Sequence, residues 1–261
     1  GHRAEALYCD PDGRFPNHEA NPLKEENLRD LQARVLSSGA VLGIAFDGDA
    51  DRAIVVDEQG GILPNDFLTA LLAREVLKRR PGAAVVYDLR SSWAGREEVA
   101  RAGGVPVRER VGHSFIKATM RERKSPFGGE LSGHTYWEEN YTADSAMIAM
   151  VRTLALLQGT GKPLSELVKP LKRYHATGEI NFIVEDKDAK IREVGKAFAD
   201  GKIDFLDGIT VEYPDWWFNV RKSNTEPLLR LVLEARTAEG KANGLKRVLA
   251  VLGEPETTAH A

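Results

Sequence analysis

A short acidic segment between two apolar runs constrains the fold of this chain more than any other feature. The apolar run 41–46 ends in three carboxylates at alternating positions: Asp47, Asp49 and Asp51. Arg52 follows directly, and then a second apolar run begins. Carboxylates this close repel one another unless a cation or protonation relieves them. Oxygen ligands that a strand delivers into a tight turn suit a divalent cation. The first of three interpretations is therefore a Mg²⁺ site in an enzyme that acts on phosphates.

Two other interpretations of the acidic segment remain open. In a calcium loop of the EF-hand type, Asp47, Asp49, Asp51 and Glu58 would occupy positions one, three, five and twelve. Arg52, however, stands at position six, where glycine is needed, and the flanks predict strands rather than helices. A haloacid dehalogenase-type phosphatase also has an apolar strand that ends in a nucleophilic Asp, with a second Asp two residues later. That family would want Thr or Val in place of Asp51.

Length and composition exclude several classes of protein. The chain of 261 residues is long enough for two or three domains with proper cores. Its net charge of −3 gives no reason to expect nucleic acid or an anionic membrane as a partner. The single cysteine, Cys9, rules out an intramolecular disulfide and suits a cytoplasmic protein. No apolar stretch approaches the length of a membrane span.

The middle of the chain alternates between helical and strand-like patterns with short connections. Such alternation predicts a largely parallel sheet with helices on both faces. The expected helices are 65–80, 92–102, 113–124 and 144–158, and the expected strands are 83–87 and 105–107.

After Gly161 the pattern changes. A short helix at 163–171 leads into a strand, a helix, three strand-like runs and a final helix. This β-α-β-β-β-α order predicts a small α+β domain with an antiparallel sheet under helices. The expected fold class is thus α/β: a mixed or parallel α/β/α sandwich followed by a small α+β domain. The expected elements of the last part are strands 180–184, 209–213, 216–220 and 228–233, and helices 187–199 and 238–252.

A second motif, Gly129-Glu130-Leu131-Ser132-Gly133-His134, joins a carboxylate, a hydroxyl and an imidazole. Glu130, Ser132 and His134 alternate, so an extended segment would point all three the same way. Together they would form a clamp for neighbouring hydroxyls of a sugar. The alternative is a polar β-turn with a capping serine.

A third motif, Arg221-Lys222-Ser223-Asn224-Thr225-Glu226-Pro227, lies between two expected strands. A guanidinium, two hydroxyls, an amide and loop N–H groups can cradle a phosphate. Arg221 would hold the phosphate through paired hydrogen bonds. The alternative is an exposed polar hairpin turn.

These three motifs, in this order, resemble the α-D-phosphohexomutase family, specifically its bacterial phosphomannomutase/phosphoglucomutase branch. The segment 11–18 also looks like the second domain of that family, so the resemblance covers the chain from about residue 5. It implies three divisions: 3–57 as the C-terminal part of domain 2 with the metal loop, 58–172 as domain 3 with the sugar-binding loop, and 173–261 as domain 4 with the phosphate-binding loop.

The resemblance also implies which residues form the site. Arg90 and His113 belong to it only through the resemblance, because alone they would be a surface charge and a helix-capping histidine. The implied residues are the Mg²⁺ ligands Asp47, Asp49 and Asp51, the catalytic Arg52, and the substrate-binding residues Arg90, His113, Glu130, Ser132, His134, Arg221, Ser223, Asn224 and Thr225.

The activity that the resemblance implies is the interconversion of hexose 1-phosphate and hexose 6-phosphate, for glucose, mannose or both. It would use Mg²⁺, a phosphoserine and a hexose 1,6-bisphosphate intermediate, with a phosphosugar as the partner. The sequence has no Ser-His-Asn-Pro motif to provide the serine. We therefore expect N-terminal domains of the same protein to be missing, this chain alone to be inactive, and its first 40 or so residues to be poorly supported or paired with another chain. A phosphosugar-binding fragment without activity and a calcium-binding module are the alternatives. The sequence predicts neither the preferred sugar nor an oligomeric state.

Overall fold

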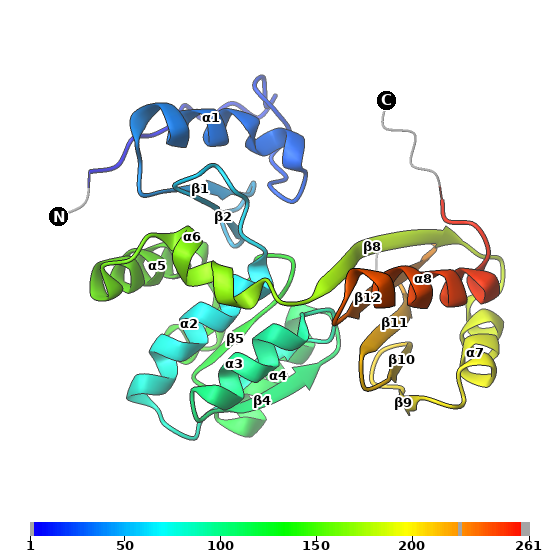
Figure 1. Cartoon of the computed structure of the whole chain (residues 1–261). Helices are drawn as coiled ribbons and strands as arrows, with labels where there is room; N and C mark the ends of the chain where they lie inside the picture. The colour runs from blue at the N-terminus through cyan, green and yellow to red at the C-terminus, as the bar shows by residue number, and fades with distance from the viewer. Residues whose placement is uncertain (1–2, 224–225, 257–261) are drawn as a thin grey trace.

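The computed structural model describes residues 3–223 and 226–256, and it contains three separate β-sheets that follow one another along the chain (Figure 1). We refer to residues 3–57, 58–172 and 173–256 as the N-terminal, central and C-terminal units, each of which holds one sheet. The central sheet is mixed and the C-terminal sheet is entirely antiparallel. The expected fold class is therefore confirmed.

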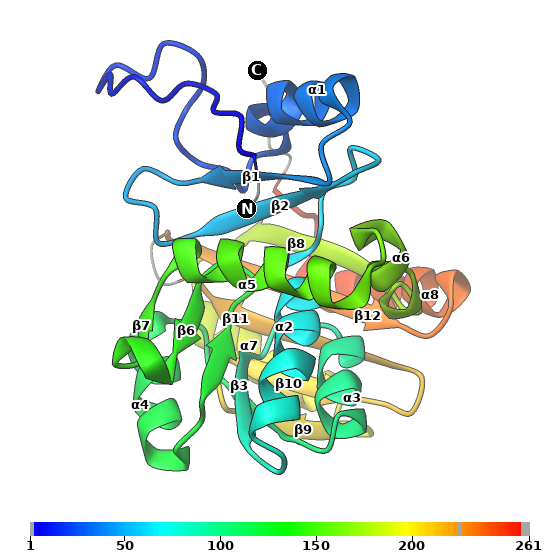
Figure 2. The same cartoon turned by 90° about the vertical axis from the view of Figure 1, so that its left-hand side faces the viewer.

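The N-terminal unit is a helix on a two-stranded antiparallel hairpin, in which Phe46 pairs with Ala53 next to the turn. The second strand is buried along its whole length because helices on both sides contact it, one of them from the central unit. Figure 2 shows the hairpin between these two helices, α1 and α5. Residues 3–24 form no helix or strand. The elements are η1 (Glu25–Leu28), α1 (Arg29–Ser38), β1 (Leu42–Phe46) and β2 (Ala53–Asp57).

The central unit is built on a five-stranded sheet in the order β4-β3-β5-β6-β7, in which β3 runs parallel to both β4 and β5. β6 and β7 continue the sheet in the antiparallel sense. The elements are α2 (Asn65–Arg79), β3 (Ala84–Asp88), α3 (Trp93–Arg101), β4 (Val105–Glu109), α4 (His113–Arg123), β5 (Phe127–Gly129), β6 (Thr135–Trp137), η2 (Glu138–Asn140), β7 (Ala143–Asp144), α5 (Ala146–Thr160), α6 (Leu164–Val168) and η3 (Lys169–Leu171).

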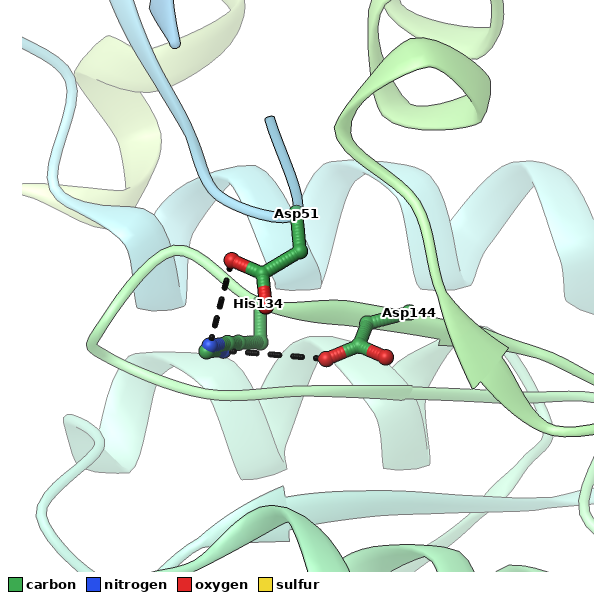
Figure 3. A group of neighbouring side chains, drawn as sticks. All are labelled: Asp51, His134 and Asp144. Atoms are coloured by element: carbon green, nitrogen blue, oxygen red, sulfur yellow. Dashed lines mark ion pairs between the residues drawn. The ribbon is translucent and has the colours of Figure 1, made fainter. Parts of the chain in front are cut away.

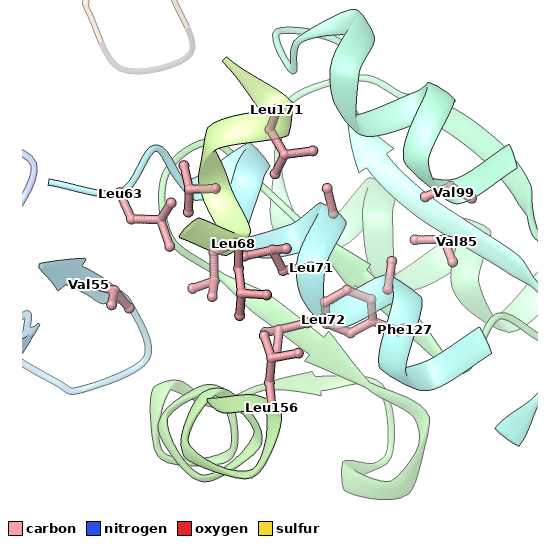
Figure 4. Close-up of a cluster of buried hydrophobic side chains, with 14 of the residues drawn as sticks. Val55, Leu63, Leu68, Leu71, Leu72, Val85, Val99, Phe127, Leu156 and Leu171 are labelled. Atoms are coloured by element: carbon pink, nitrogen blue, oxygen red, sulfur yellow. The ribbon is translucent and has the colours of Figure 1, made fainter. Parts of the chain in front are cut away.

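Both faces of the central sheet are covered by helices. Successive residues of a strand point to opposite faces, and Val85 and Val86 accordingly join different clusters. Val85 packs with the leucines of α2, whereas Val86 packs with Ile116 and Met120 of α4. Val55 of β2 belongs to the first cluster too, so the hairpin shares the core of the central unit (Figure 4).

The C-terminal unit is a five-stranded antiparallel sheet in the order β8-β12-β11-β10-β9. Two helices cover one face and bury an aromatic cluster that includes Phe198 and Phe218. The elements are β8 (His175–Ile183), α7 (Lys187–Ala197), β9 (Lys202–Asp204), β10 (Ile209–Glu212), β11 (Trp216–Lys222), β12 (Leu228–Ala235) and α8 (Ala238–Leu252).

A buried carboxylate joins the C-terminal unit to the central unit. Glu234 of β12 is only 3% exposed, and it accepts hydrogen bonds from the Trp93 amide (2.9 Å) and the Trp217 indole (3.0 Å). Trp93 starts α3, so this contact reaches across from one unit to the other. An unpaired buried carboxylate would be costly, and the two units are therefore held in one specific arrangement.

Most predicted elements are present, with ends displaced by a few residues. The helix expected at 144–158 corresponds to α5. It begins at Ala146 because Ser145 is the residue that caps it. The predicted strand order of the C-terminal unit was wrong in lacking β9. Helix α1 and strands β5, β6 and β7 were also not predicted, and the strands have only two or three residues each. Such lengths are too short for an alternating pattern to emerge. Among residues 3–223 and 226–256, no helix combines the length and the apolar composition that a membrane crossing requires.

The buried Asp66 side chain at the start of α2 predicts a pH-dependent stability. Burial raises the pKa of Asp66 from 3.8 to about 6, although the amides of Ser92 and Phe67 donate hydrogen bonds to it. Because the pKa of Asp66 is higher in the folded protein than in the unfolded chain, the protonated side chain stabilises the fold. This contribution to the free energy of unfolding is complete below about pH 4 and is lost as the pH rises through about 6. We expect Asp66→Asn to remove this dependence. The free energy of unfolding of the variant, relative to that of the wild type, should therefore rise by about 2–3 kcal/mol between pH 4 and pH 7.

The measurement is urea denaturation of both proteins across that pH range. Asp215→Asn, at a carboxylate that is 81% exposed, serves as the control that should change little. A difference between Asp66→Asn and the wild type that does not vary with pH would contradict this account.

Candidate functional site

The predicted metal ligands lie in the turn of the β1–β2 hairpin. The Ala50 amide donates to the Asp47 carbonyl (3.2 Å), and Ala50 adopts a left-handed φ of 60° that reverses the chain. Carboxylate oxygens of Asp47, Asp49 and Asp51 all lie within 4.8 Å of one another. The structure therefore brings the three side chains together, and their role as ligands stays a prediction.

Charge repulsion in this turn is only partly relieved by the chain itself. Burial would raise the pKa of Asp47, but the Arg52 amide (3.1 Å) and its Nε (2.6 Å) donate hydrogen bonds that lower it overall. Burial raises the pKa of Asp51, and the neighbouring carboxylates Asp47 and Asp49 raise it further. Asp51 Oδ1 is buried without a hydrogen-bond partner among the described residues. A divalent cation would satisfy that oxygen and offset the repulsion, so these side chains fit Mg²⁺.

The secondary structure around the acidic turn differs from what the two competing interpretations require. An EF-hand loop lies between helices, whereas this turn joins two antiparallel strands. Glu58, the expected twelfth-position ligand, instead accepts hydrogen bonds from the amide and hydroxyl of Ser165 in α6. For a dehalogenase-type phosphatase we expect a parallel sheet around the nucleophile, but β1 pairs with antiparallel β2 within the described ranges.

The segment 130–134 is a tight turn between β5 and β6 rather than an extended strand. The Glu130 amide donates to the His134 carbonyl (2.9 Å), and the Gly133 amide donates to the Glu130 carbonyl (3.1 Å). The expectation that Glu130, Ser132 and His134 point the same way is therefore wrong. Glu130 and Ser132 stay together, with the Ser132 hydroxyl 3.2 Å from Glu130 Oε2, while the Tyr136 hydroxyl also donates to Glu130.

His134 faces the predicted metal loop, residues 47–52, instead of the other two side chains. Its Nε2 is 3.6 Å from Asp51 Oδ1, and its Nδ1 is 3.9 Å from Asp144 Oδ2, so the ring lies between two carboxylates (Figure 3). The other oxygen of Asp144 accepts a hydrogen bond from Lys117 (2.8 Å). The backbone of Arg52 also forms a β-bridge with His134. The turn 130–134 therefore contacts the metal loop through both backbone and side chain.

The opposite side of the same turn is attached to Asp88, the last residue of β3. Asp88 is fully buried and accepts a hydrogen bond from the Leu131 amide (2.7 Å). It also forms a paired hydrogen bond with Arg90, at 3.1 Å to Nε and 2.9 Å to Nη2. Burial would lower the pKa of Arg90, but Asp88, Glu179 and Glu130 outweigh this effect and raise it. Arg90 is thus a permanently charged, nearly buried group beside Glu130.

The predicted phosphate loop differs most from expectation. Arg221 is not in a loop but near the end of β11, where it is 2% exposed and donates to Glu179 of β8 (2.8 Å). Ser223 follows the strand, and its hydroxyl accepts from the Glu226 amide (3.2 Å). Asn224 and Thr225 lie outside the described residues. Arg221 therefore stands beside Arg90 rather than at the tip of a hairpin, because Glu179 also lies 3.7 Å from Arg90.

The remaining prediction, His113, is the exposed first residue of α4. None of the contacts described above brings it to the other site residues. Sequence reasoning missed Asp88, Lys117, Tyr136, Asp144 and Glu179. Asp88 had a signal, since it follows an apolar strand directly. Glu179 had none, because only the pairing of β8 with β12 brings it near Arg221.

Comparisons with known proteins point to one family along the chain. Three consecutive models of the phosphoglucomutase/phosphomannomutase family match: alpha/beta/alpha domain II over residues 2–61, alpha/beta/alpha domain III over 64–174, and the C-terminal domain over 179–251. A phosphomannomutase from Methanocaldococcus jannaschii is 43% identical over 93% of this chain and 55% of its own length. A phosphomannomutase/phosphoglucomutase from Pseudomonas aeruginosa is 39% identical over 89% of this chain and 51% of its own.

A solved structure agrees with these sequence matches. The crystal structure of a phosphoglucomutase/phosphomannomutase family protein from Burkholderia thailandensis superposes with a TM-score of 0.86 and 36% sequence identity. The match covers 95% of this chain and 55% of that protein. The chain thus spans about half the length of the relatives that it matches.

The attachment of Arg90 and Leu131 to Asp88 predicts a large effect on stability. In Asp88→Asn the shape is kept, but Arg90 loses its charged partner in a buried setting. Breaking a buried ion pair costs about 3–5 kcal/mol, so we expect a loss of that size in the free energy of unfolding. Asp12→Asn is the control: its pair with Arg14 is at the surface, so we expect its effect on the free energy of unfolding to be far smaller than that of Asp88→Asn. Equal effects of the two substitutions in urea denaturation would contradict the role of Asp88.

Proposed function

The chain belongs to the phosphoglucomutase/phosphomannomutase family, and on that premise we propose that it provides the metal, sugar and phosphate sites of an isomerase that interconverts hexose 1-phosphates and hexose 6-phosphates. The observation that carries the proposal is the position of the turn 130–134. One side of it contacts Asp51 through His134, and the other side is tied through Asp88 to Arg90. A sugar at this turn would have a cation on one side and guanidinium groups on the other.

The metal loop is assigned to Mg²⁺, held by Asp47, Asp49 and Asp51. When bound, the ion would withdraw charge from phosphoryl oxygens during transfer. Arg52 keeps Asp47 ionised, because its hydrogen bonds lower the pKa of that carboxylate. The Arg52 side chain is 27% exposed, so it can also reach a phosphate that approaches the turn.

The sugar site is assigned to Glu130 and Ser132. Glu130 is 4% exposed, and its carboxylate already accepts from Tyr136 and Ser132. The two hydroxyl groups hold the Glu130 carboxylate in one orientation, and its remaining lone pairs therefore point in fixed directions. Such a carboxylate accepts hydrogen bonds from sugar hydroxyls more strongly than a neutral group would.

The phosphate that does not react is assigned to the guanidinium groups of Arg90 and Arg221, with Ser223 nearby. Holding that phosphate leaves the other end of the sugar at the metal loop. Because each end of the hexose carries a phosphate in turn through a 1,6-bisphosphate, the same site would accept the sugar in both orientations. Arginine suits this task, since its charge is permanent and its planar fork matches phosphate oxygens.

The first test of this proposal is a calorimetric titration of Mg²⁺ into the protein. Loss of residues that only orient a metal ligand weakens affinity by about 10–100-fold, so removing a ligand should cost at least about tenfold. Asp49→Asn is the best variant, because Asp49 is exposed and its loss leaves the hairpin packing intact. Asp215→Asn should bind like the wild type, and unchanged binding by Asp49→Asn would refute the assignment.

A second test separates the sugar site from the phosphate site. Hydrogen bonds to a charged group contribute about 1.5–3 kcal/mol, so Glu130→Gln should weaken glucose 1-phosphate binding by about tenfold or more. Its affinity for inorganic phosphate should not fall, because Glu130 offers a phosphate at Arg90 no hydrogen-bond donor and only a negative charge. Ser132→Ala gives the same contrast with a smaller change. Glu139→Gln, at an exposed ion pair with Arg152, is the control.

Turnover is measured on the protein in the full form that its gene encodes. We expect Mg²⁺-dependent interconversion of glucose 1-phosphate and glucose 6-phosphate, of the mannose pair, or of both. Binding of phosphosugar without turnover would favour the alternative function, a phosphosugar-binding protein. The absence of both would overturn the proposal.

A further inference from the structure

Three arginines from two units converge on one carboxylate, that of Glu179 in β8. Arg221 Nη2 lies 2.8 Å from Glu179 Oε2, Arg230 Nη1 lies 3.0 Å from Oε1, and Arg90 Nη1 lies 3.7 Å from Oε2. Arg90 belongs to the central unit, whereas the other two belong to neighbouring strands of the C-terminal sheet. We refer to Arg90, Arg221 and Arg230 as the arginine cluster.

Two carboxylates, Asp88 and Glu179, form the ion pairs of Arg90 and Arg221 among the described residues, while Glu130 and Asp207 act on the same two guanidinium groups without an ion-pair contact. Arg90 has a second carboxylate partner in Asp88. Arg230 has one in Glu226, which is 51% exposed and therefore well screened. Arg221 is 2% exposed, and its carboxylate partner among the described residues is Glu179. Arg230 Nε is buried with no hydrogen-bond partner among residues 3–223 and 226–256. A guanidinium donor left unsatisfied in this way indicates capacity for a larger anion.

The backbone around Glu179 is irregular in a way that aims its side chain. The preceding residue, Gly178, has a left-handed φ of 73°. The pairing of β8 with β12 shifts register between Val232 and Glu234, directly after the pair Val232–Glu179. Bulges of this kind redirect a side chain. β8 is also an edge strand, and the Glu179 side chain is 27% exposed, so it can leave the cluster without disturbing the sheet core.

We propose that Glu179 is an internal substitute for phosphate: it occupies the arginine cluster when no ligand is bound, and a phosphate monoester displaces it. This inference rests on the proposed function, because it concerns the phosphate end of the same substrate. The reason is electrostatic. Arg221 cannot lose its proton, so its buried charge needs an anion at all times. Glu179 provides one in the free protein. A phosphate offers more acceptor oxygens and more charge, and it can satisfy all three guanidinium groups, including Arg230 Nε.

Glu179 and a phosphate cannot both remain in the cluster, since like charges at this distance repel. Binding therefore includes the cost of expelling Glu179, and this cost lowers the affinity for phosphate. Expulsion would also release the contact of Glu179 with Arg90, which is one of the links between the central and C-terminal units. Glu179 is a positioning residue in this account: it holds the three guanidinium groups in place before the ligand arrives, and then gives way to it.

The test compares Glu179→Gln with the wild type by calorimetric titration of inorganic phosphate. Removing the competing charge while keeping the shape should tighten phosphate binding by about tenfold, which corresponds to about 1.4 kcal/mol. Glu212→Gln is the matched control: Glu212 lies in the same sheet, is 23% exposed and pairs with Arg96 at 2.7 Å, away from the cluster. It should bind phosphate like the wild type.

Thermal unfolding gives an independent measurement, which remains informative if Glu179→Gln is much less stable than the wild type. Without phosphate, Glu179→Gln should have a lower Tm than the wild type, because Arg221 is left without a carboxylate. Added phosphate should raise its Tm more than that of the wild type, since the anion then replaces what was removed. Glu179→Asp keeps the charge on a shorter side chain and should fall between the two proteins in both measurements.

Phosphate binding by Glu179→Gln that equals or falls below that of the wild type would overturn the inference, as would no phosphate binding by any of these proteins. The probe contains no sugar and no turnover is measured. Failure of this inference can therefore be distinguished from failure of the proposed function. Tighter phosphate binding by Glu179→Gln without hexose phosphate conversion by the full protein would refute the mutase proposal and leave this inference standing.

Discussion

The geometry of the candidate site depends on one buried carboxylate, that of Asp88. It ends β3, which is hydrogen-bonded on both sides, to β4 and to β5, and it is fully buried there. The carboxyl group of Asp88 stays ionised. Burial alone would raise its pKa, but the charge of Arg90 and the hydrogen bonds from Arg90 and the Leu131 amide lower it overall. A single anion thereby fixes both the turn 130–134 and the guanidinium of Arg90. The carboxyl ends of neighbouring parallel strands meet at one edge of a sheet, where ligand sites of α/β proteins lie.

The metal loop is placed against this turn by two different kinds of contact. On the polar side, the Ala53 amide donates to the Gly133 carbonyl (3.3 Å), next to the Arg52–His134 bridge. On the apolar side, Val55 of the same hairpin packs in the core of the central unit. A two-stranded hairpin is at best marginally stable alone. Its burial between α1 and α5 gives the three aspartates a defined position relative to the turn 130–134.

The C-terminal unit is joined to the central unit by a small apolar cluster, in which Trp93 packs with Trp217 and Val232, and by several charged and polar contacts. Glu234 binds two tryptophans, Arg173 pairs with Glu97 and Glu98, and Glu179 reaches Arg90. Buried ion pairs contribute little net stability, but each one that is broken is costly. Such a junction has a specific arrangement, and it also responds to a ligand that competes for the same charges. A purely apolar junction would hold the units together without that sensitivity.

Local sequence determined most of the longer helices and strands and the side chains that the three motifs offer. Alternating patterns set the order of helices and strands, and the spacing of Asp47, Asp49 and Asp51 was sufficient to predict carboxylates gathered in one turn, because neighbours in a short turn are close whatever the rest of the fold does. The tertiary structure decided which groups face one another. It turned His134 away from Glu130 and toward Asp51, since a tight turn replaces strand alternation there. It also paired Arg221 with Glu179, 42 residues away, through strand pairing that no local pattern specifies.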